Sequence, residues 1–417
     1  MQKVNEQIPG AGTRQQILFV DDDALVLRGI GREMRAYSDR WQVTTALGGE
    51  RAMEILRERS FDILVTDMLM PVVDGATLLH HVREHYPSMV RIVLSGHAEL
   101  EHAVRSVPFA HQRLLKPWRG DELVKTLERA TNLRLLVGDD LIRRCISQVG
   151  SLPSSQGAYA RLAAALDAPT ASFASVAAVA GADMAMSAKL LQLANSAFVG
   201  AGRVVTRMED AVRTVGLTTI RQYLLSPFLN VFEMFSPAGS DANARFAHLG
   251  SHALLTANLC AALARKDEWR SQAFITGILH DIGSLVLLSR MPEVARELAA
   301  ESRAKECSVE SLEMRRFGVT HAEIGGYLLG LWGLPADICS AVSQHHENGQ
   351  GFEPGELSLT LRVANWLARE HEARSAKGVT DPSVLVLDHD EALLAAFGVT
   401  TDLPRLFALA AAQSSRA

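Results

Sequence analysis

Acidic residues in the first third of the chain are placed where they could hold a divalent cation together. The triplet DDD at 21–23 follows an apolar run at 17–20, and Asp67 follows a second apolar run at 63–66. Carboxylates that converge repel one another unless a cation joins them, and hard oxygen ligands with open water positions suit Mg²⁺. Such a cation would neutralise an incoming phosphoryl group while the Asp67 carboxylate attacks phosphorus to give an acyl phosphate. The pattern therefore predicts Mg²⁺-dependent phosphorylation of an aspartate.

Two further side chains suited to phosphate binding follow apolar runs in the same part of the chain. Ser95 follows the run 91–94, and Lys116 follows the run 113–115. A lysine supplies a positive charge to a phosphate oxygen, and a serine hydroxyl supplies a hydrogen-bond donor. Any one of these residues alone is usually a solvated loop side chain. Their shared position after apolar runs, together with the turn at 71–75, favours a single site.

Five short β-rich runs must position these side chains. The runs alternate with helical patterns of roughly ten to fifteen residues, and they lie at 17–20, 42–45, 63–66, 91–94 and 113–115. Alternating β and α units predict a parallel sheet that is covered by helices on both faces. Five units in about 120 residues fit a flavodoxin-like, doubly wound domain, whose site lies outside the carboxyl ends of the strands. The aspartates, the serine and the lysine all fall at those ends.

Histidines form a second pattern later in the chain. The sequence HDIG at 280–283 ends an apolar helical segment, and adjacent His and Asp side chains at a helix end can face one metal ion. Further histidines occur at 321 and in HHE at 345–347, and His248 and His252 lie one helical turn apart. A lone histidine on an apolar helix is usually a hydrogen-bonded core residue. A metal site and ordinary core packing therefore both remain open for this set.

The chain changes character after residue 150. The segment SLPSSQG at 151–157 places a proline and a glycine among serines, which is typical of a domain boundary. Beyond it, Ala- and Leu-rich helical segments follow one another, so the second part should be nearly all α. We predict a first domain at 14–133, a connecting helix at 134–150, a second domain at 151–350 and a helical C-terminal extension at 351–417.

Composition restricts the partners and the location of the protein. The 417 residues carry 42 Lys and Arg against 47 Asp and Glu, and this net charge of −5 without a dense basic run argues against nucleic-acid binding. The longest charge-free Ala-rich stretch, at 168–182, is shorter than the roughly 20 residues of a membrane helix. The N-terminus lacks the apolar segment of a secretory signal, and the four cysteines contain no CxxC pair. We expect a soluble, cytoplasmic protein.

The first domain resembles the receiver domain of two-component response regulators. The resemblance rests on VDDD at 20–23, TDMLMPVVDG at 66–75, LSG at 94–96 and LLKPW at 114–118. The chain departs from the family at Arg113, where receiver domains usually carry an aromatic switch residue. The resemblance implies Asp67 as phosphoacceptor, Asp21, Asp22, Asp67 and the backbone carbonyl of Leu69 as Mg²⁺ ligands, and Ser95 and Lys116 as phosphate-sensing residues.

The second domain resembles HDOD domains, which are relatives of the HD metal-dependent phosphohydrolases. The segments LLQLANSAFVG at 190–200, HDIG at 280–283, THAEIGGYLLGLWGLP at 320–335 and AVSQHHE at 341–347 carry this resemblance. It implies an all-helical HD-type bundle that serves as a signalling output module. It also matches positions at which the HD-GYP relatives, which hydrolyse cyclic di-GMP, use His and Asp side chains, namely His252, His280, Asp281, His321, His345 and His346.

Three departures from the HD-GYP pattern argue against that hydrolytic activity. Ser284 stands where a lysine usually follows HDIG, the GYP segment after HHE is absent, and Asn365 stands in place of a late aspartate ligand. A neutral amide is a weaker metal ligand than a carboxylate, and the loss of supporting groups typically lowers metal affinity and activity.

These features predict a response regulator of a phosphorelay whose output domain acts through protein–protein interaction. The implied partners are a sensor histidine kinase or phosphotransfer protein and an unknown downstream protein, with no direct DNA binding, no membrane association, and homodimer formation left open. The implied cofactor is Mg²⁺ at the aspartates. The alternative is a phosphorylation-controlled HD-type metal phosphohydrolase, such as a cyclic dinucleotide phosphodiesterase, with Fe, Mn or Zn at the histidines. Whether the protein is an enzyme therefore stays open.

Overall fold

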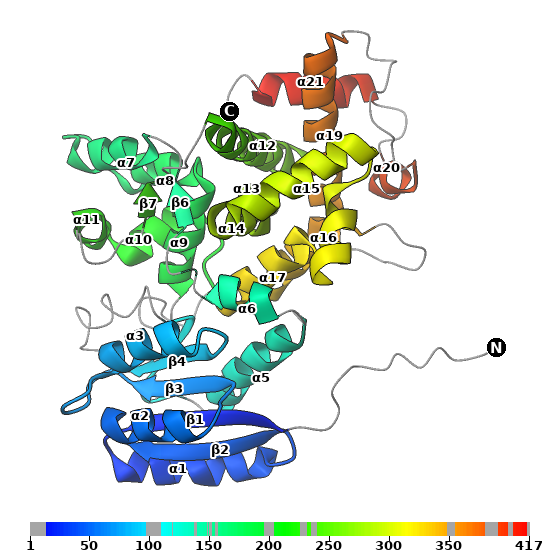
Figure 1. The fold of residues 1–417 in the computed structure, drawn as a ribbon. Coiled ribbons are helices and arrows are strands. Elements are labelled where there is room, and N and C mark those ends of the chain that lie inside the picture. The colour runs from blue at the N-terminus through cyan, green and yellow to red at the C-terminus, as the bar shows by residue number, and fades with distance from the viewer. Residues whose placement is uncertain are drawn as a thin grey trace. The chain divides into compact units, whose positions relative to one another are not determined.

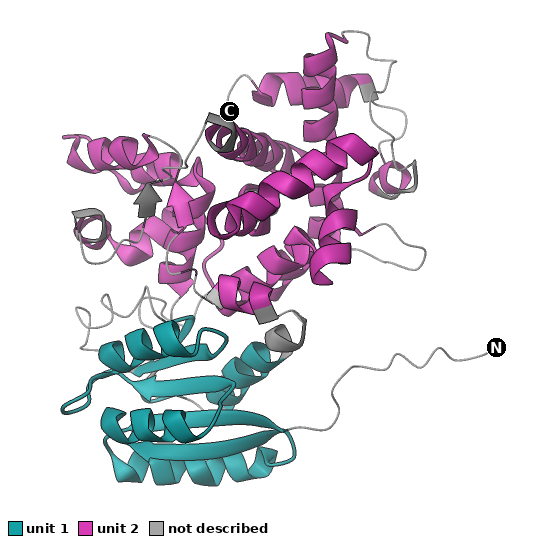
Figure 2. Cartoon of the chain, in the orientation of Figure 1, with its two compact units in different colours: residues 1–131 teal, residues 132–417 magenta. Residues whose placement is uncertain are grey.

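The chain forms two compact units, residues 1–131 and 132–417 (Figure 1, Figure 2). The structure is a computed structural model, and the residues that it describes are all except 1–13, 97–109, 119, 137–139, 148, 150–151, 155–156, 196–203, 226–231, 235–239, 348–354, 380–390, 399–402 and 415–417. Each unit has a hydrophobic core of its own.

The first unit is built on one parallel five-stranded sheet, which confirms the predicted fold. The strand order is β2-β1-β3-β4-β5, the order of flavodoxin-like folds. Each strand contains one of the predicted β-rich runs. The central strands β1 and β3 are covered on both faces, and they are accordingly buried along most or all of their length. The strands are β1 (Gln15–Asp21), β2 (Trp41–Leu47), β3 (Ile63–Asp67), β4 (Val90–Ser95) and β5 (Gln112–Leu115).

Helices that follow the strands in the chain cover the sheet. The helices α2 and α3 pack on the face that carries Leu18, Val20 and Leu64. Because side chains alternate along a strand, Ile17 and Phe19 point to the opposite face, and both are fully buried. The described helices of this unit are α1 (Ala24–Met34), the 3₁₀ turn η1 (Arg35–Tyr37), α2 (Gly49–Glu58), α3 (Gly75–His85) and α5 (Gly120–Leu136).

The second unit is helical, as predicted, with one small addition. The three-residue strands β6 (Leu152–Ser154) and β7 (Phe232–Met234) pair in parallel. Strands this short have no periodicity to detect in the sequence. The helices are α6 (Asp140–Ser147), α7 (Ala158–Asp167), α8 (Phe173–Gly181), α9 (Met184–Asn195), α10 (Met208–Val215), α11 (Leu217–Leu225), α12 (Ser240–Leu263), η2 (Asp267–Trp269), α13 (Arg270–Leu279), α14 (Ile282–Arg290), α15 (Pro292–Lys305), α16 (Val309–Phe317), α17 (His321–Leu331), α18 (Ala336–Ser343), α19 (Glu356–Lys377), α20 (Glu391–Phe397) and α21 (Leu403–Ser414).

Close helix contacts at glycines bring the histidine-bearing helices together. A Cβ atom at Gly277 of α13 would lie 2.5 Å from the Cα of Ala257 on α12. A Cβ atom at Gly283 of α14 would collide with the backbone oxygen of His321, the first residue of α17. Glycine is therefore required at both positions for α12, α13, α14 and α17 to approach this closely.

Helix α6, in the segment predicted to connect the domains, packs inside the second unit. It contacts α14 and α17, and its side chains Ile142 and Ile146 are fully buried. At the other end of the chain, α20 and α21 add Leu394, Phe397 and Phe407 to a core that α12 and α19 also line.

One apolar stretch among the described residues, at 267–290, is long and apolar enough to cross a membrane by length and composition alone. In the structure the stretch is broken between α13 and α14, at His280 and Asp281. Its most apolar window is 72% buried inside the protein, as a core helix of a folded bundle would be.

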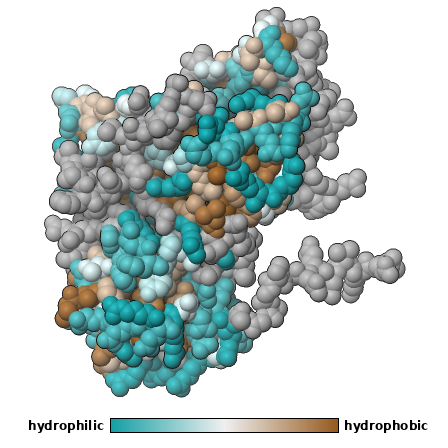
Figure 3. Space-filling model, in the orientation of Figure 1, coloured by the Kyte–Doolittle hydropathy of each residue, from teal (hydrophilic) through white to brown (hydrophobic). Residues whose placement is uncertain are grey.

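On the visible face of the first unit, hydrophilic side chains predominate (Figure 3).

Candidate functional site

Three carboxylates and a lysine meet at the C-terminal edge of the five-stranded sheet. Asp21 ends β1, Asp67 ends the neighbouring strand β3, and Asp22 follows Asp21 in the chain. One carboxylate oxygen from each of the three lies within 4.8 Å of the others. The Nζ of Lys116 lies 2.7 Å from Asp21 Oδ2 and 2.7 Å from Asp67 Oδ1. The structure thus brings together four of the residues that the sequence singled out.

Burial and charge govern protonation at this acidic site. Burial raises the pKa of Asp67 above its ordinary value, although Lys116 opposes the shift. Burial acts to lower the pKa of Lys116, but its hydrogen bonds to Asp21 and Asp67 and the charges of both outweigh burial, so that pKa is raised. Three carboxylates and one ammonium group leave an excess of two negative charges. An oxygen-only donor set with this charge fits Mg²⁺.

Local hydrogen bonds hold the two strand-end aspartates in place. The backbone N–H of Asp23 donates to Asp21 Oδ1 at 2.9 Å, and the Asp23 side chain caps the N-terminus of α1. After β3, the N–H of Gly75 donates to the carbonyl of Met68 at 2.9 Å. A Cβ at residue 75 would collide with the backbone oxygen of Asp67, so glycine is needed for the chain to turn back here.

The remaining predicted positions of this site are only partly described. Ser95 ends β4, the neighbour of β3, but its side chain lies outside the described residues. Leu69 lies in the loop after β3 and is 43% exposed. Arg113, at the position of the usual aromatic switch, is buried in β5. The peptide bond between Lys116 and Pro117 is cis.

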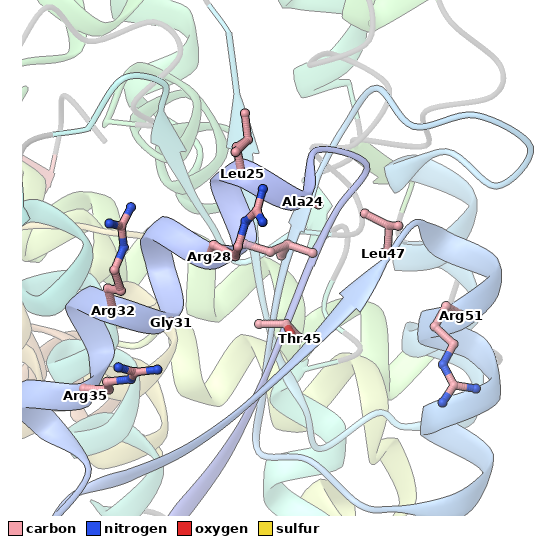
Figure 4. Close-up of a pocket in the computed structure, with 10 residues that line it drawn as sticks. Ala24, Leu25, Arg28, Gly31, Arg32, Arg35, Thr45, Leu47 and Arg51 are labelled. Atoms are coloured by element: carbon pink, nitrogen blue, oxygen red, sulfur yellow. The ribbon is translucent and has the colours of Figure 1, made fainter.

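A basic surface pocket lies next to the acidic site in the first unit. Its lining includes three arginines of α1 and its C-terminal end and one of α2, namely Arg28, Arg32, Arg35 and Arg51 (Figure 4). It also includes Leu25, just beyond Asp23, and Leu47, which stands opposite Asp21 in the β1–β2 register. The two leucines are 66% and 57% exposed.

The arginines along α1 carry uncompensated charge. Arg51 pairs with Glu54 at 2.6 Å. By contrast, Arg28, Arg32 and Arg35 form no ion pair within the part of the chain that the structure describes. The pocket therefore offers positive charge and exposed apolar surface beside an acidic centre.

The second unit gathers its predicted residues around one carboxylate. Asp281 Oδ2 lies 3.2 Å from the Nε2 of His280 and 3.9 Å from the Nε2 of His252. Asp281 Oδ1 lies 3.3 Å from the Nε2 of His321 and 3.5 Å from the Nε2 of His345. The two oxygens of Asp281 thus face two different pairs of histidines.

The sixth predicted residue completes one of these groups. His346 Nε2 lies 3.1 Å from His321 Nε2. The possible ligand atoms of Asp281, His321, His345 and His346 lie within 4.8 Å of one another, and those of Asp281, His252 and His280 form a second set by the same measure. All six candidate ligands therefore lie in one cluster, with Asp281 shared between two groups.

Backbone carbonyls orient two of the imidazoles. His280 Nδ1 lies 2.7 Å from the carbonyl oxygen of Gly277, and His345 Nδ1 lies 2.6 Å from that of Val342. A carbonyl can only accept, so each Nδ1 donates its proton and each Nε2 is left as the lone-pair atom that faces Asp281.

A buried glutamate and a half-buried one orient two other imidazoles. Glu313 Oε2 accepts from both the backbone N–H and the ring Nδ1 of His321, each at 2.8 Å. Glu372 accepts from His252 Nδ1 at 3.1 Å. Hydrogen-bonded carboxylates of this kind are the usual outer partners of metal-ligating histidines, because they fix the ring and raise its basicity.

The protonation of the cluster is strongly perturbed. The neighbouring imidazoles outweigh burial and hold the pKa of Asp281 well below its ordinary value. Burial lowers the pKa of His345 to about 4. Glu313 and Asp281 outweigh burial at His321 and hold its pKa well above the ordinary value. An ionised carboxylate and neutral imidazoles are the forms that bind metals, so Asp281 and His345 favour binding, whereas His321 would have to release a proton when a metal binds.

The donor atoms fit a transition metal ion. Metal–nitrogen and metal–oxygen distances of about 2.0–2.2 Å imply ligand–ligand separations of about 3.0–3.5 Å. The separations around His321 are 3.1 and 3.3 Å. In addition, the Nε2 atoms of His280 and His345 are buried and have no hydrogen-bond partner of suitable geometry. Such unsatisfied acceptors are costly unless they have a ligand to bind.

The sequence did not single out the acidic residues around this cluster. Glu313 and Glu372 lie behind histidines, and Glu310 Oε1 lies 3.2 Å from His346 Nε2. Asn365, noted only as a replacement, places its Oδ1 at 3.0 Å from His252 Nε2. Helical glutamates are common on any surface, so no spacing rule distinguishes these three from the rest.

Comparison with known families finds one family in each unit. Residues 17–128 match the response regulator receiver domain, and residues 152–348 match the HDOD domain. The fold and these matches define the class as response regulators. The chain carries a receiver domain followed by an HDOD domain, as the motifs predicted.

Individual relatives cover only parts of the chain. HoxA, a hydrogenase transcriptional regulatory protein of Cupriavidus necator, is 32% identical over 125 residues, which are 30% of this chain and 25% of that protein. NtrC, a DNA-binding transcriptional regulator of Proteus hauseri, is 30% identical over 156 residues, or 34% of this chain and 31% of that protein. An uncharacterized protein of Treponema pallidum is 24% identical over 226 residues, or 53% of this chain and 43% of that protein. The chain spans less than half the length of each.

Solved structures give similar partial matches. The MmoQ response regulator of Methylococcus capsulatus has 23% identity and a TM-score of 0.48, over 62% of this chain and 98% of that one. The signal receiver domain of an HD domain-containing protein of Pseudomonas fluorescens has 27% identity and a TM-score of 0.28, over 29% of this chain and 98% of that one.

Proposed function

We propose that this response regulator is switched by phosphorylation of Asp67. The proposal is carried by the contacts of Lys116, which lies 2.7 Å from both Asp21 and Asp67. In the reaction, a bond forms between an Asp67 oxygen and phosphorus as the bond from phosphorus to the donor's histidine nitrogen breaks. Lys116 can then exchange the carboxylate for a phosphoryl oxygen, and Ser95 would donate to another.

The metal at this site would be Mg²⁺, which receiver domains generally bind for phosphorylation. Asp21, Asp22, Asp67 and the backbone carbonyl of Leu69 would hold it, and it would supply the positive charge that offsets the phosphoryl group. The excess of negative charge at the site supports this assignment.

A direct test is labelling of the purified chain by a small phosphodonor such as acetyl phosphate with Mg²⁺. Asp67→Asn should abolish labelling, whereas Asp39→Asn should not, because Asp39 is an exposed carboxylate remote from the site. Labelling that persists in Asp67→Asn would show that another residue is the acceptor.

The partners follow from this chemistry. A sensor histidine kinase or phosphotransfer protein must bring a phosphohistidine to Asp67, and it must therefore contact the surface around the acidic site. We place its docking site at the basic pocket of Arg28, Arg32 and Arg35, where acidic side chains of the partner would find unpaired positive charge. The soluble character of these domains favours a cytoplasmic protein.

The HDOD domain would provide the output through protein–protein interaction, either with a downstream protein or within a homodimer, and without direct DNA binding. Helix α6 supports a route for the signal, because it is the first helix after α5 and packs on α14 and α17. Those two helices begin at the histidine cluster, directly after Asp281 and at His321. A shift of α6 would therefore reach the cluster through packed side chains.

A second candidate function is metal-dependent phosphoester hydrolysis in the HDOD domain. It is favoured by the convergence of imidazole Nε2 atoms on Asp281 with their Nδ1 atoms already anchored. Such a centre would hold Fe, Mn or Zn and supply a Lewis acid to a phosphoester. Ser284 and Asn365 remain the sequence features against activity.

Metal analysis separates these two outputs. The enzyme hypothesis expects near-stoichiometric Fe, Mn or Zn in the purified protein, hydrolysis of cyclic di-GMP or bis(p-nitrophenyl) phosphate, and loss of both with His280→Ala. Bound metal without hydrolysis, or no metal at all, would leave the interaction module as the function of the domain.

A further inference from the structure

The two groups of ligands in the histidine cluster differ in completeness. The first group contains Asp281, His321, His345 and His346, and the second contains His252 and His280 with the shared Asp281. We propose that this chain holds one metal ion, in the first group, and that Asn365 keeps the second group closed to metal. The inference rests on the proposed metal centre and states its stoichiometry.

The first group already has the geometry of a coordination sphere. His321 Nε2 lies 3.3 Å from Asp281 Oδ1 and 3.1 Å from His346 Nε2, and His345 Nε2 lies 3.5 Å from Asp281 Oδ1. These are the edges expected for four donors at about 2.0–2.2 Å from one ion.

The second group has only part of this geometry. His280 Nε2 lies 3.2 Å from Asp281 Oδ2, which matches a ligand–ligand edge, but the third ligand does not fit. His252 Nε2 lies 3.9 Å from Asp281 Oδ2, which is wider than a ligand–ligand edge, and only 3.0 Å from Asn365 Oδ1. His252 Nδ1 is bound to Glu372 at 3.1 Å. The nitrogen of His252 that would face a metal therefore contacts the neutral amide of Asn365, where a carboxylate or a further imidazole would be needed to hold an ion.

The charges near the two groups also favour a single metal ion in the first group. Asp281 is the one carboxylate, among the described candidate ligands, that both groups share. The first group gains a second anion nearby, since Glu310 Oε1 lies 3.2 Å from His346 Nε2. At the Nε2 of His252 the second group instead has the neutral amide of Asn365, and its own nearby anion, Glu372, is bound to the other ring nitrogen. Two divalent ions bridged by one carboxylate repel each other strongly unless further anions bind them.

A single substitution should open the second group. Asn365→Asp places a carboxylate of nearly the same shape opposite His252 Nε2, where the amide oxygen now lies. The carboxylate supplies both the missing negative charge and a stronger ligand. The chain should then hold two ions, bridged by Asp281.

The test uses the full chain, stripped of metal and reloaded with Zn²⁺ in excess Mg²⁺, which occupies the oxygen-only site of the receiver domain. Zinc per chain is measured by mass spectrometry after gel filtration, with circular dichroism to confirm folding. We expect one zinc in the wild type and two in Asn365→Asp. His346→Ala should lose the single zinc, whereas His252→Gln, which keeps a hydrogen-bonding side chain opposite Glu372, should retain it.

Several results would overturn the inference while the metal centre stands. They are two zinc ions in the wild type, one zinc in a folded Asn365→Asp chain, or loss of the single zinc in His252→Gln. No zinc in the wild type would overturn the proposed metal centre itself, and the stoichiometry with it.

Discussion

At the scale of single residues, each site gathers polar side chains in a largely buried place and holds them in fixed orientations. In the receiver domain, Lys116 contacts two carboxylates at 2.7 Å each and leaves an excess of negative charge for a cation. In the HDOD domain, imidazoles surround Asp281, and carbonyls or glutamates behind them fix their orientation. Each site therefore presents preoriented donor atoms to a cation.

The role of the supporting glutamates can be measured. Glu313→Gln keeps the shape of the side chain but removes the charge that holds His321 by two hydrogen bonds. We expect zinc affinity to fall about 10- to 100-fold, as is typical for outer partners of metal ligands. Competition with a chelator of known affinity measures the change. Glu297→Gln is the control, because Glu297 makes only a surface ion pair with Arg316; equal affinity in both variants would refute the role of Glu313.

The residues that follow strands could be predicted from the sequence, whereas the glutamates that hydrogen-bond to the histidines could not. Asp21, Asp67 and Lys116 follow apolar runs, so the strand-end rule locates them from the sequence alone. Glu313 lies eight positions before His321, on a different helix, and nothing in a single sequence links the two. Only the packing of α16 against the start of α17 reveals the pair.

At the scale of elements, the histidine cluster depends on close helix packing. The glycine of the HDIG motif has a packing reason, since a Cβ at Gly283 would collide with the backbone of His321 and lie 2.8 Å from the nitrogen of Gly325. The motif therefore encodes a helix–helix contact as well as two ligands.

Gly283→Ala should consequently destabilise the HDOD domain and lower its zinc content. Overpacking of a buried contact costs about 1–3 kcal/mol, and the separation of α14 from α17 would move His321 away from Asp281. Urea unfolding gives the free-energy change. Gly250→Ala is the matched control, because a Cβ there meets nothing within 4 Å and alanine favours the helix. An unaltered unfolding midpoint in Gly283→Ala would contradict the packing argument.

The helices and strands could be predicted where they are long enough to show a clear hydrophobic pattern in the sequence. The run 63–66 forms most of β3, which is buried at all of its positions. Strands β6 and β7 were not predicted, because three residues are too few to show alternation. The apolar helical segment that ends at HDIG was predicted, but the stretch 267–290 was not singled out as a possible membrane span, because charged residues such as Asp281 interrupt it.

At the scale of the whole molecule, the chain joins a receiver domain to an HDOD domain through α5 and α6. We propose the basic pocket along α1 as the docking surface for a partner, because Arg28, Arg32 and Arg35 form no ion pair among the described residues. Reversing the charge of these arginines should weaken the docking of a partner kinase and leave the phosphorylation of the acidic site intact.

We expect the double variant Arg28→Glu and Arg32→Glu to lower kcat/KM for phosphotransfer at least about tenfold, because like charges would then face each other at the interface. The assay uses a sensor kinase that phosphorylates the wild-type chain. Labelling by acetyl phosphate should stay normal, since no partner needs to dock. Arg59→Glu, outside the pocket, should behave as the wild type. If the double variant lost labelling by both donors, the defect would lie in the acidic site and not in docking.

The central claim is that the state of Asp67 controls the HDOD domain. Hydrogen–deuterium exchange of the full chain, with Mg²⁺ and with or without the phosphoryl mimic beryllofluoride, tests it most directly. We predict that beryllofluoride changes exchange in α6 and in the segments that begin α14 and α17, and that Asp67→Asn removes these changes. Changed exchange at the acidic site of the wild type, with identical exchange throughout the HDOD domain, would contradict the claim.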